Sequence, residues 1–330
     1  MNVLVTGGAG YIGSHAVKRL REGGHNVVVV DNLFRGHRQA VPQDVPFEKV
    51  DLRETQALAD VMSRHDIQCV MHFAALAYVG ESVTEPLRYY DNNTTGSISL
   101  LQAMDLAGVK RIVFSSTCAT YGQPETMPLT EDMPQSPINP YGWSKLFVER
   151  ILRDYGAANR DFAFAALRYF NVAGCASDGS LGEDHEPETH IIPVMLNAAL
   201  GKIEKVTIFG DDYDTPDGTC IRDYIHVEDL VDAHVVVMDA LQPGDARFYN
   251  LGIGRGRSVK ELIDAAKKVT GVDFKVEIGP RRPGDPPRLY ADASKIAREL
   301  GWQAKVREIE PMIESAWRWF RANPNGYSKS

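Results

Sequence analysis

Short apolar runs alternate with amphipathic stretches through the first 170 residues of the chain. The apolar runs, rich in Val, Ile and Phe, predict strands at Val3–Val5, Val27–Val30, Cys69–Phe73, Ile112–Phe114 and Phe162–Leu167. The stretches between them have helical periodicity and lie at Ile12–Arg21, Thr55–Arg64, Gly96–Ala107 and Tyr141–Tyr155. Strands that alternate with helices in this way are typical of βαβ units, so the pattern predicts an α/β protein with a doubly wound parallel sheet.

The pattern changes at about residue 171. Gly174–Thr189 is polar and acidic, Ile191–Leu200 again has helical periodicity, and two loops rich in Pro, Gly and charge lie at Asp211–Gly218 and Gly279–Pro287. Long loops of this composition in a compact chain are usually functional. We therefore expect two domains: residues 1–170 carry the sheet, and residues 171–330 form a smaller α+β domain, of which the stretch near 221–245 packs back on the first.

Composition excludes several classes of protein. The 330 residues carry a net charge of −8, with a pI of about 5.6, and no basic stripe of the kind that a nucleic-acid binder needs. No apolar run approaches the roughly 20 residues that span a bilayer, and no signal peptide opens the chain. The four cysteines form no C-x-x-C pair, which favours reduced thiols. We expect a cytoplasmic protein that binds neither membranes nor nucleic acid.

A glycine turn lies between the first predicted strand and the first predicted helix. Gly7, Gly10 and Gly13 have the spacing G-x-x-G-x-x-G, which lets a pyrophosphate approach backbone N–H groups at a helix N-terminus. Asp31 ends the second apolar run, 18 residues after Gly13, near the spacing of a carboxylate that binds the adenosine ribose. The first domain is therefore predicted to be a Rossmann-type dinucleotide-binding domain that prefers NAD, although Arg35, His37 and Arg38 weaken the preference over NADP.

A tyrosine and a lysine four residues apart are the candidate catalytic pair. Pro140 is a plausible first residue of a helix, and Tyr141 and Lys145 then share one helix face. A phenol with a pKa near 10 is a poor base at neutral pH, and lowering that pKa by ~3 units requires ~4 kcal/mol, which a close ammonium can supply. Thr117 ends a predicted strand 24 residues upstream, where the ligand crevice of such a sheet lies. Together with the glycine turn, these residues resemble the extended short-chain dehydrogenase/reductase family.

Further motifs across nearly the whole chain resemble the UDP-glucose 4-epimerase family. They are TGGAGYIGSH at 6–15, DNL at 31–33, HFAA at 72–75, VGES at 79–82, YYDNN at 89–93, RYFNVAG at 168–174, IFGDDYDTPDGTCIRDYIHVEDL at 208–230 and PRRPGDPP at 280–287. The resemblance implies NAD-dependent interconversion of UDP-glucose and UDP-galactose in galactose metabolism. In this reaction the sugar is oxidised at C-4, the 4-keto sugar rotates, and the hydride returns to its other face.

The resemblance also implies roles for individual residues. Tyr141 would be the base, Lys145 would hold the ribose and lower the pKa of Tyr141, and Thr117 would contact the 4-oxygen. Positions matching cofactor contacts are Gly7, Gly10, Tyr11, Ile12, Gly13, Asp31, Asn32, Leu33, Arg35, Gly36, Asp51, Leu52, Phe73, Ala74, Ala75, Ala77, Asn92, Tyr141, Lys145 and Phe170. Positions matching UDP-sugar contacts are Thr117, Tyr141, Asn171, His190, Ile191, Thr207, Phe209, Arg222, Arg282 and Leu289.

The resemblance also implies a homodimer that packs through the helices near 96–107 and 141–155.

Three positions depart from common members of the family. Thr117 stands where many members have Ser, and Ala77 stands where some have Lys. Leu289 is intermediate between the Tyr of members restricted to glucose and galactose and the small residue of members that accept N-acetylated sugars. Activity on UDP-GlcNAc and UDP-GalNAc therefore stays open.

The residues around the catalytic candidates also bear on other functions. A nucleotide-sugar 4,6-dehydratase needs an acid pair after the strand-end hydroxyl, and here Cys118-Ala119-Thr120 follows Thr117, which disfavours dehydration. UDP-pentose and UDP-hexuronate 4-epimerases use the same catalytic groups and stay open. A non-catalytic dinucleotide-binding protein is disfavoured because both Tyr141 and Lys145 are present. The run Gly182–Glu186 with His190 suggests metal ligands, but a carboxylate-rich loop is more often solvated, so we expect no metal.

Overall fold

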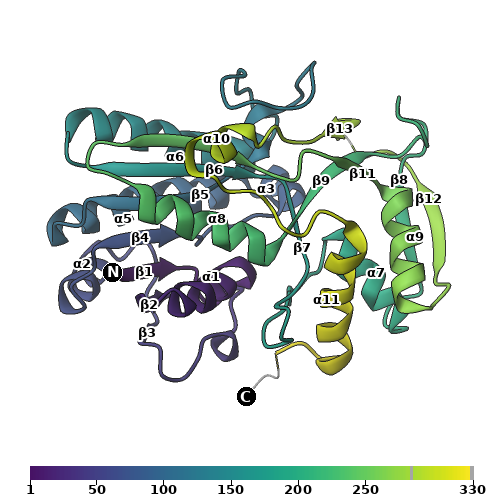
Figure 1. Ribbon diagram of the computed structural model, residues 1–330, viewed down its shortest axis with the longest axis horizontal. Helices are drawn as coiled ribbons and strands as arrows, with labels where there is room; N and C mark the ends of the chain where they lie inside the picture. The colour runs from purple at the N-terminus through teal and green to yellow at the C-terminus, as the bar shows by residue number, and fades with distance from the viewer. Residues whose placement is uncertain (283–284, 328–330) are drawn as a thin grey trace.

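A parallel sheet forms the centre of the larger part of the molecule in the computed structural model, which describes residues 1–282 and 285–327 (Figure 1). Across this sheet the seven strands found in the described residues lie in the order β10 (Ala246–Leu251), β6 (Ala163–Tyr169), β5 (Arg111–Thr117), β4 (Cys69–His72), β1 (Asn2–Thr6), β2 (Asn26–Val30) and β3 (Phe47–Glu48). The chain leaves β1 toward β3 and then returns to β4 on the other side of β1. The Rossmann-type doubly wound sheet expected from the sequence is thereby confirmed.

Helices cover both faces of this sheet. Helices α1 (Tyr11–Glu22) and α8 (Val227–Ala240) lie on one face, and α2 (Thr55–Arg64), α5 (Gly96–Ala107) and α6 (Pro140–Ala158) lie on the other (Figure 1). Alternate residues of β1 serve the two layers, since Val3 and Val5 pack with α1 and α8 while Leu4 packs with α2 and α5. A strand buried on both faces explains the continuous apolar runs of the sequence.

The helix ends follow local sequence signals. Helix α6 begins at Pro140, as expected, and the side chain of Asn139 caps it by accepting a hydrogen bond from the N–H of Gly142 at 2.8 Å. Helix α5 ends before Gly108, whose φ of +73° is the left-handed conformation that glycine adopts without strain. The predicted helices at 55–64 and 96–107 have the same bounds as α2 and α5.

The second half of the chain builds a separate core beside the sheet (Figure 1). Its strands form two small sheets: β7 (Asn171–Ala173), β9 (Ile221–His226), β11 (Gly256–Ser258) and β13 (Arg288–Leu289) in one, and β8 (Lys205–Phe209) and β12 (Lys275–Gly279) in the other. The helices packed with them are α7 (Ile191–Ala199), α9 (Val259–Thr270) and α11 (Ile309–Ala322). This core supplies the strand ends and loops that face the large sheet.

Shorter elements complete the described chain. They are η1 (Arg38–Ala40), α3 (Val79–Thr84), α4 (Pro86–Tyr89), the π-helical η2 (Tyr90–Thr95), η3 (Cys118–Tyr121) and α10 (Ser294–Leu300). The stretch near 221–245 contains α8, which packs against α1, and the strand β10 that follows it belongs to the large sheet. A domain boundary at residue 170 stays a prediction.

Two further expectations concern the whole chain. All four cysteines are free thiols, in agreement with the spacing argument. Among the described residues, every helix is too short or too polar to cross a membrane.

Candidate active site

The glycine turn connects β1 to α1 and is too tight for side chains. Gly7 has a φ of +71°, and a Cβ on it would lie 2.6 Å from the backbone nitrogen of Ala74. A Cβ on Gly13 would lie 2.0 Å from the carbonyl oxygen of Gly7, so the first turn of α1 reaches the loop only because glycine is there. Gly10 caps α1 without a side chain. Tyr11 and Ile12 are the first two residues of this helix, whose N-terminus is suited to an anion.

Asp31 lies at the end of β2 beside this turn. Its carboxylate is buried and accepts hydrogen bonds from the backbone N–H groups of Ala9 at 3.0 Å and Leu33 at 2.8 Å. Burial raises the pKa of Asp31, and these two N–H bonds offset part of the shift. Gly36 packs against the same carboxylate, since a Cβ there would lie 3.0 Å from Asp31 Oδ1. The structure thus joins the predicted ribose carboxylate to the glycine turn.

The neighbouring cofactor candidates follow β2 and β3. Asn32 is exposed, and its amide donates to Asp51 Oδ2 at 2.9 Å. Hydrogen bonds from Arg53 hold the pKa of Asp51 far below its usual value. Leu52 is buried against the first residue of α5. These contacts bring the segments after β2 and β3 into one surface.

Arg35 is held by groups from the segment that follows β4. Its Nη2 contacts both carboxylate oxygens of Glu81 at 2.7 and 2.9 Å, and its guanidinium lies 3.7 Å from the centre of the Tyr78 ring. The buried Nη1 of Arg35 has no hydrogen-bond partner among the described residues. Arg35 is therefore an ion-paired side chain with one N–H donor left without a partner in the described residues.

The segment after β4 connects the cofactor candidates to the catalytic helix. It contains four candidates, Phe73, Ala74, Ala75 and the exposed Ala77. The side-chain amide of Asn93 donates to the carbonyl oxygen of Leu76 and to Ser144 Oγ of α6, both at 2.9 Å. Asn92 of η2 donates to Asn93 Oδ1 at 3.0 Å. Asn93 therefore links this segment to α6 through its side-chain amide.

Tyr141, Lys145 and Thr117 are buried together where β5 ends against α6. Lys145 Nζ donates to the carbonyl oxygen of Ser115 at 2.9 Å and lies 4.9 Å from the centre of the Phe114 ring. Thr117 Oγ1 accepts from the N–H of Ala119 at 3.2 Å and interacts with the phenol of Tyr141. The helix face predicted from the spacing thus points at the strand-end hydroxyl.

The pKa values of the pair differ from the sequence-based expectation. Burial raises the pKa of Tyr141 above its usual value, Tyr169 raises it further, and the hydrogen bond with Thr117 offsets part of the rise. Burial lowers the pKa of Lys145 to about 7. Burial is the largest cause of the shift of Tyr141, and a role of Lys145 in lowering that pKa stays a prediction.

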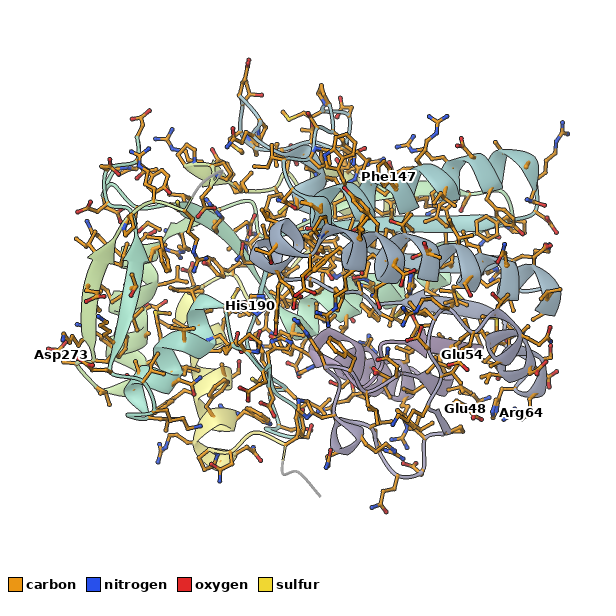
Figure 2. All side chains as sticks on the ribbon, turned by 180° about the vertical axis from the view of Figure 1, so that it is seen from behind. Glu48, Glu54, Arg64, Phe147, His190 and Asp273 are labelled. Carbon is orange, nitrogen blue, oxygen red and sulfur yellow. The ribbon has the colours of Figure 1, made fainter. Side chains whose placement is uncertain are left out.

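The substrate candidates form two groups in the second half. Asn171 opens β7 and pairs with Tyr224 of β9, and the preceding Phe170 is buried. His190 caps the N-terminus of α7, and Ile191 is its first residue. Figure 2 shows His190 near the middle of the molecule, between the large sheet and the second core.

Two arginines and an aromatic ring form the other group. Arg222 of β9 is largely buried, and its Nη2 donates to Asp285 Oδ1 at 2.6 Å. The guanidinium of Arg282 lies 3.9 Å from the centre of the Phe209 ring at the end of β8, the strand that also carries Thr207. The motif at 280–287 includes residues 283 and 284, which lie outside the described residues.

Leu289 lies beside Arg222 in the pairing of β13 with β9. It packs in a small apolar cluster with Phe170, Tyr121 and Cys118, next to Thr117. The structure therefore places Leu289, the position linked to substrate range, close to the end of β5 that carries Thr117.

The acidic loop before α7 is not the solvated loop expected from its composition. Glu183 is 96% buried, and its Oε1 lies 2.6 Å from His190 Nδ1 and 3.3 Å from His185 Nδ1. Burial lowers the pKa of His185, but its interactions with the carboxylates of Glu183 and Glu188 outweigh burial and raise it to about 10. The ligand-rich run that the sequence suggested is thus a real side-chain cluster.

Sequence reasoning missed the roles of three buried charged residues near the site. Glu149 of α6 and Arg168 of β6 form a fully buried ion pair behind the catalytic residues. Asp223 of β9 accepts from the N–H groups of Ile253, Gly254 and Ala291, and burial raises its pKa to about 6. Glu149 follows Tyr141 and Lys145 at intervals of four residues, so the sequence could have placed it on the same helix face and indicated a buried partner such as Arg168. The partners of Asp223 lie thirty or more positions later in the sequence, so no local pattern indicated them.

Comparisons with known proteins show which family the chain resembles over its whole length. A model of the NAD dependent epimerase/dehydratase family matches residues 3–252. The chain is 51% identical over 328 residues to UDP-glucose 4-epimerase from Lactobacillus helveticus, covering 99% of both chains. It is 47% identical over 342 residues to probable UDP-arabinose 4-epimerase 3 from Oryza sativa subsp. japonica, covering 100% of this chain and 84% of that one. A crystal structure of UDP-glucose 4-epimerase from Bifidobacterium longum in complex with NAD+ and UDP matches with a TM-score of 0.94 and 43% identity, covering 99% of this chain and 100% of that one.

Proposed function

The chain belongs to the NAD dependent epimerase/dehydratase family, and on this premise we propose that it interconverts UDP-glucose and UDP-galactose by inverting C-4 of the sugar. The enzyme is then an isomerase, and its cofactor is NAD. One observation carries the proposal: Tyr141 and Lys145 of α6 are buried against the end of β5, where the phenol meets the hydroxyl of Thr117.

The groups around the glycine turn fit NAD. The N-terminus of α1 and the free Nη1 of Arg35 suit a pyrophosphate, and the anchored carboxylate of Asp31 suits a ribose diol. Lys145, buried at the end of β5, would hold the second ribose. When bound at this place, NAD supplies a hydride acceptor for C-4 and returns the same hydride afterwards.

Tyr141 is the group that moves the proton in this proposal. Its phenol would take the proton of the 4-hydroxyl as hydride leaves C-4, and would return it in the reverse step. Burial raises the pKa of Tyr141, so positive charge close to the phenol is needed for it to act as a base. Thr117 would hold the 4-oxygen, which keeps the proton transfer within one hydrogen bond.

The second half would hold the nucleotide while the sugar turns. Arg222 and Arg282 supply guanidinium groups for the diphosphate, and the ring of Phe209 positions Arg282. Asn171, His190, Ile191 and Thr207 would complete the UDP site. Arg222 forms an ion pair with Asp285, and a diphosphate bound to Arg222 would compete with this carboxylate.

A second substrate class is favoured by one comparison. The relative from Oryza sativa is named for UDP-arabinose, and UDP-pentoses require the same catalytic groups. UDP-GlcNAc and UDP-GalNAc depend on the space beside Leu289. We keep UDP-glucose and UDP-galactose as the principal substrates because the relative with the higher identity is named for them.

Assembly and location belong to the proposal as well. Helices α5 and α6 expose large apolar side chains, namely Ile98, Leu106, Trp143 and Phe147, the last of which is labelled in Figure 2. Exposed apolar faces of this kind mark interaction sites, so we propose that two copies of the chain pack through these helices as a homodimer. The four free thiols suit the cytoplasm.

A panel of UDP-sugars incubated with the purified protein, with no cofactor added, tests the function. We expect UDP-galactose to form from UDP-glucose, and no NADH to accumulate in proportion to product. Stoichiometric NADH would indicate a dehydrogenase, and a product absorbing as a 4-keto sugar would indicate a dehydratase.

A further inference from the structure

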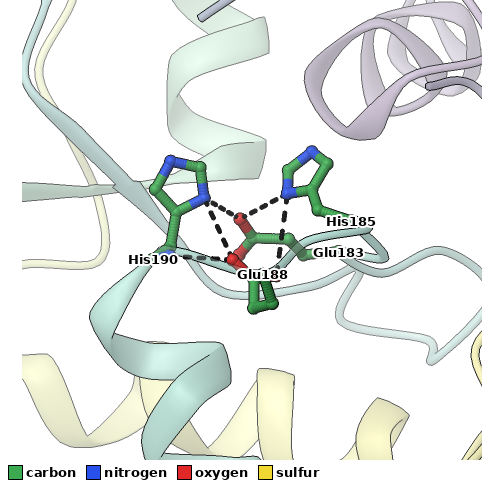
Figure 3. A group of neighbouring side chains, drawn as sticks. All are labelled: Glu183, His185, Glu188 and His190. Atoms are coloured by element: carbon green, nitrogen blue, oxygen red, sulfur yellow. Dashed lines mark hydrogen bonds and ion pairs between the residues drawn. The ribbon is translucent and has the colours of Figure 1, made fainter. Parts of the chain in front are cut away.

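Four potential metal ligands converge in the loop that precedes α7. The nitrogen and oxygen atoms that Glu183, His185, Glu188 and His190 can offer all lie within 4.8 Å of one another. Figure 3 shows the two imidazole rings on opposite sides of the Glu183 carboxylate, both turned toward it. Glu183 and Glu188 are largely buried. This arrangement differs from a solvated acidic loop, because two nitrogen donors face two shielded carboxylates.

One of the nitrogen donors points into the cluster without a hydrogen-bond partner. The Nδ1 atom of His185 is buried, and no described residue forms a hydrogen bond with it. It lies 3.3 Å from Glu183 Oε1 and 3.7 Å from Glu188 Oε2. These two contacts are ion pairs without a hydrogen bond, and a buried nitrogen that makes no hydrogen bond is costly unless something else satisfies it. A metal ion at the centre of the cluster would do so.

The spacing of the four atoms matches a small tetrahedral ion. Ligands bonded to Zn²⁺ at about 2.0–2.1 Å are separated from each other by roughly 3.3 Å. His185 Nδ1 lies 3.3 Å from Glu183 Oε1, which is close to this value. The two carboxylate oxygens of Glu188 each face one imidazole, with Oε1 3.6 Å from His190 Nδ1 and Oε2 3.7 Å from His185 Nδ1. The 2.6 Å contact between His190 Nδ1 and Glu183 Oε1 has to open by less than 1 Å as the proton between them leaves.

We propose that Glu183, His185, Glu188 and His190 bind one divalent transition-metal ion, with Zn²⁺ as the best match. Two imidazoles with two carboxylates are a ligand set that zinc accepts, whereas Ca²⁺ and Mg²⁺ prefer sites made of oxygen alone. The inference does not rest on the proposed function, because none of its four donors takes part in proton or hydride transfer.

The place of the site indicates what the ion does. The ring of His185 packs edge-on against Tyr11 of α1 and against Tyr78, and His190 caps α7. The hydroxyl of Tyr11 donates to the carbonyl oxygen of Gly174 at 2.5 Å, ahead of the same loop. A bound ion would therefore hold the loop in place between α1, which follows the glycine turn, and α7, whose first residues belong to the proposed UDP site. We expect the ion to stabilise the fold rather than to act on the substrate.

Zinc titration of untagged, cofactor-loaded protein after treatment with a chelator tests the site. We expect about one Zn²⁺ per chain by elemental analysis after gel filtration, and a higher midpoint of thermal unfolding with zinc than without. His185→Ala and Glu188→Gln should lose the stoichiometric ion and the shift. Glu186→Gln is the matched control, because Glu186 lies in the same loop, is exposed and is not among the four donors.

The zinc content of wild type and of the two ligand variants decides whether the four residues form a metal site. Zinc retained equally by wild type, His185→Ala and Glu188→Gln would overturn the proposal, as would the absence of stoichiometric zinc in wild type. Far-UV circular dichroism and retained cofactor show that the variants are folded, so that loss of zinc is not loss of structure. Co²⁺ in place of Zn²⁺ adds a visible spectrum that reports tetrahedral ligands and disappears in His185→Ala. Epimerase assays of the same samples are read separately, since the chain can bind zinc without catalysing epimerisation and the reverse.

Discussion

Arg168 donates two hydrogen bonds to Glu149 inside the protein, from Nε to Oε1 at 2.9 Å and from Nη2 to Oε2 at 2.7 Å. Neither side chain is measurably in contact with solvent, at 0% and 1% exposure. Ser116, the residue before Thr117, donates to the same carboxylate at 2.6 Å. Glu149 lies one turn beyond Lys145 on α6. The Arg168–Glu149 ion pair therefore fixes the position of the helix face that carries Tyr141 and Lys145 relative to β5 and β6.

Glu149→Ala should destabilise the protein strongly. Removing one partner of a buried ion pair leaves an uncompensated charge, which typically costs about 3–5 kcal/mol. Arg150→Ala is the control on the same helix, since its pair with Asp154 is exposed and should be worth at most ~0.5 kcal/mol. Urea unfolding measures both. Similar losses of unfolding free energy in the two variants would show that the buried pair has no special role.

Tyr141→Phe should remove catalysis while leaving the cofactor in place. The substitution keeps the ring that packs against Leu76 and Tyr89 but removes the hydroxyl that moves the proton. Loss of a general acid–base group reduces turnover by roughly 10²–10⁴-fold. Tyr155→Phe, which removes a hydroxyl from the outer part of the same helix, should retain wild-type turnover. Steady-state assays with retained NAD as the folding check decide this, and near-normal turnover of Tyr141→Phe would refute the assignment of the base.

The buried lysine predicts a particular dependence of stability on pH. The pKa of Lys145 is lowered from 10.5 to about 7 by burial, so between these values the unfolded state binds more protons than the folded state. The free energy of unfolding should therefore rise with pH across this window, by roughly 4–5 kcal/mol for a shift of this size. Lys145→Met should flatten the rise.

Denaturant unfolding of cofactor-free protein at about pH 7 and about pH 10 measures this effect, because the other titrating groups cancel between wild type and variant. Parallel pH profiles for the two proteins would show that Lys145 keeps its ordinary pKa in the folded state.

Leu289→Tyr should narrow the range of substrates. Leu289 packs with Phe170 and Cys118 beside the catalytic strand end, where a larger ring would take the space of an N-acetyl group. We expect kcat/KM for UDP-GlcNAc, where wild type turns it over, to fall by roughly 10–200-fold relative to UDP-glucose. Competition assays with both substrates give the ratio directly. An equal decrease for the two sugars would exclude a role of this position in specificity.

Local sequence signals predicted much of the fold. The runs of Val and Ile in β1 and β2, the bounds of α2 and α5, and the start of α6 at Pro140 are encoded by neighbouring residues. Strand β10 was not predicted, because its place at the edge of the large sheet depends on pairing with β6, some eighty residues earlier. Pairings over such distances leave no local pattern to read.

The candidate site shows the same division. The spacing of Tyr141 and Lys145 predicted a shared helix face, and both side chains do lie buried on it. The protonation of the pair could not be predicted, because it depends on burial and on the Ser115 carbonyl that takes the ammonium. The pairing of Arg222 with Asp285 and the closure of the Glu183 cluster likewise depend on how loops fold onto each other.

The central claim is that C-4 is oxidised and reduced again within one active site. UDP-galactose carrying deuterium at C-4, incubated with the protein in ordinary water and with no cofactor added, tests this most directly. The account predicts UDP-glucose that retains the deuterium at C-4, observed by mass spectrometry and NMR, because the hydride that leaves is the hydride that returns. Product in which C-4 carries hydrogen from the solvent would contradict it, as would the absence of any C-4 epimer.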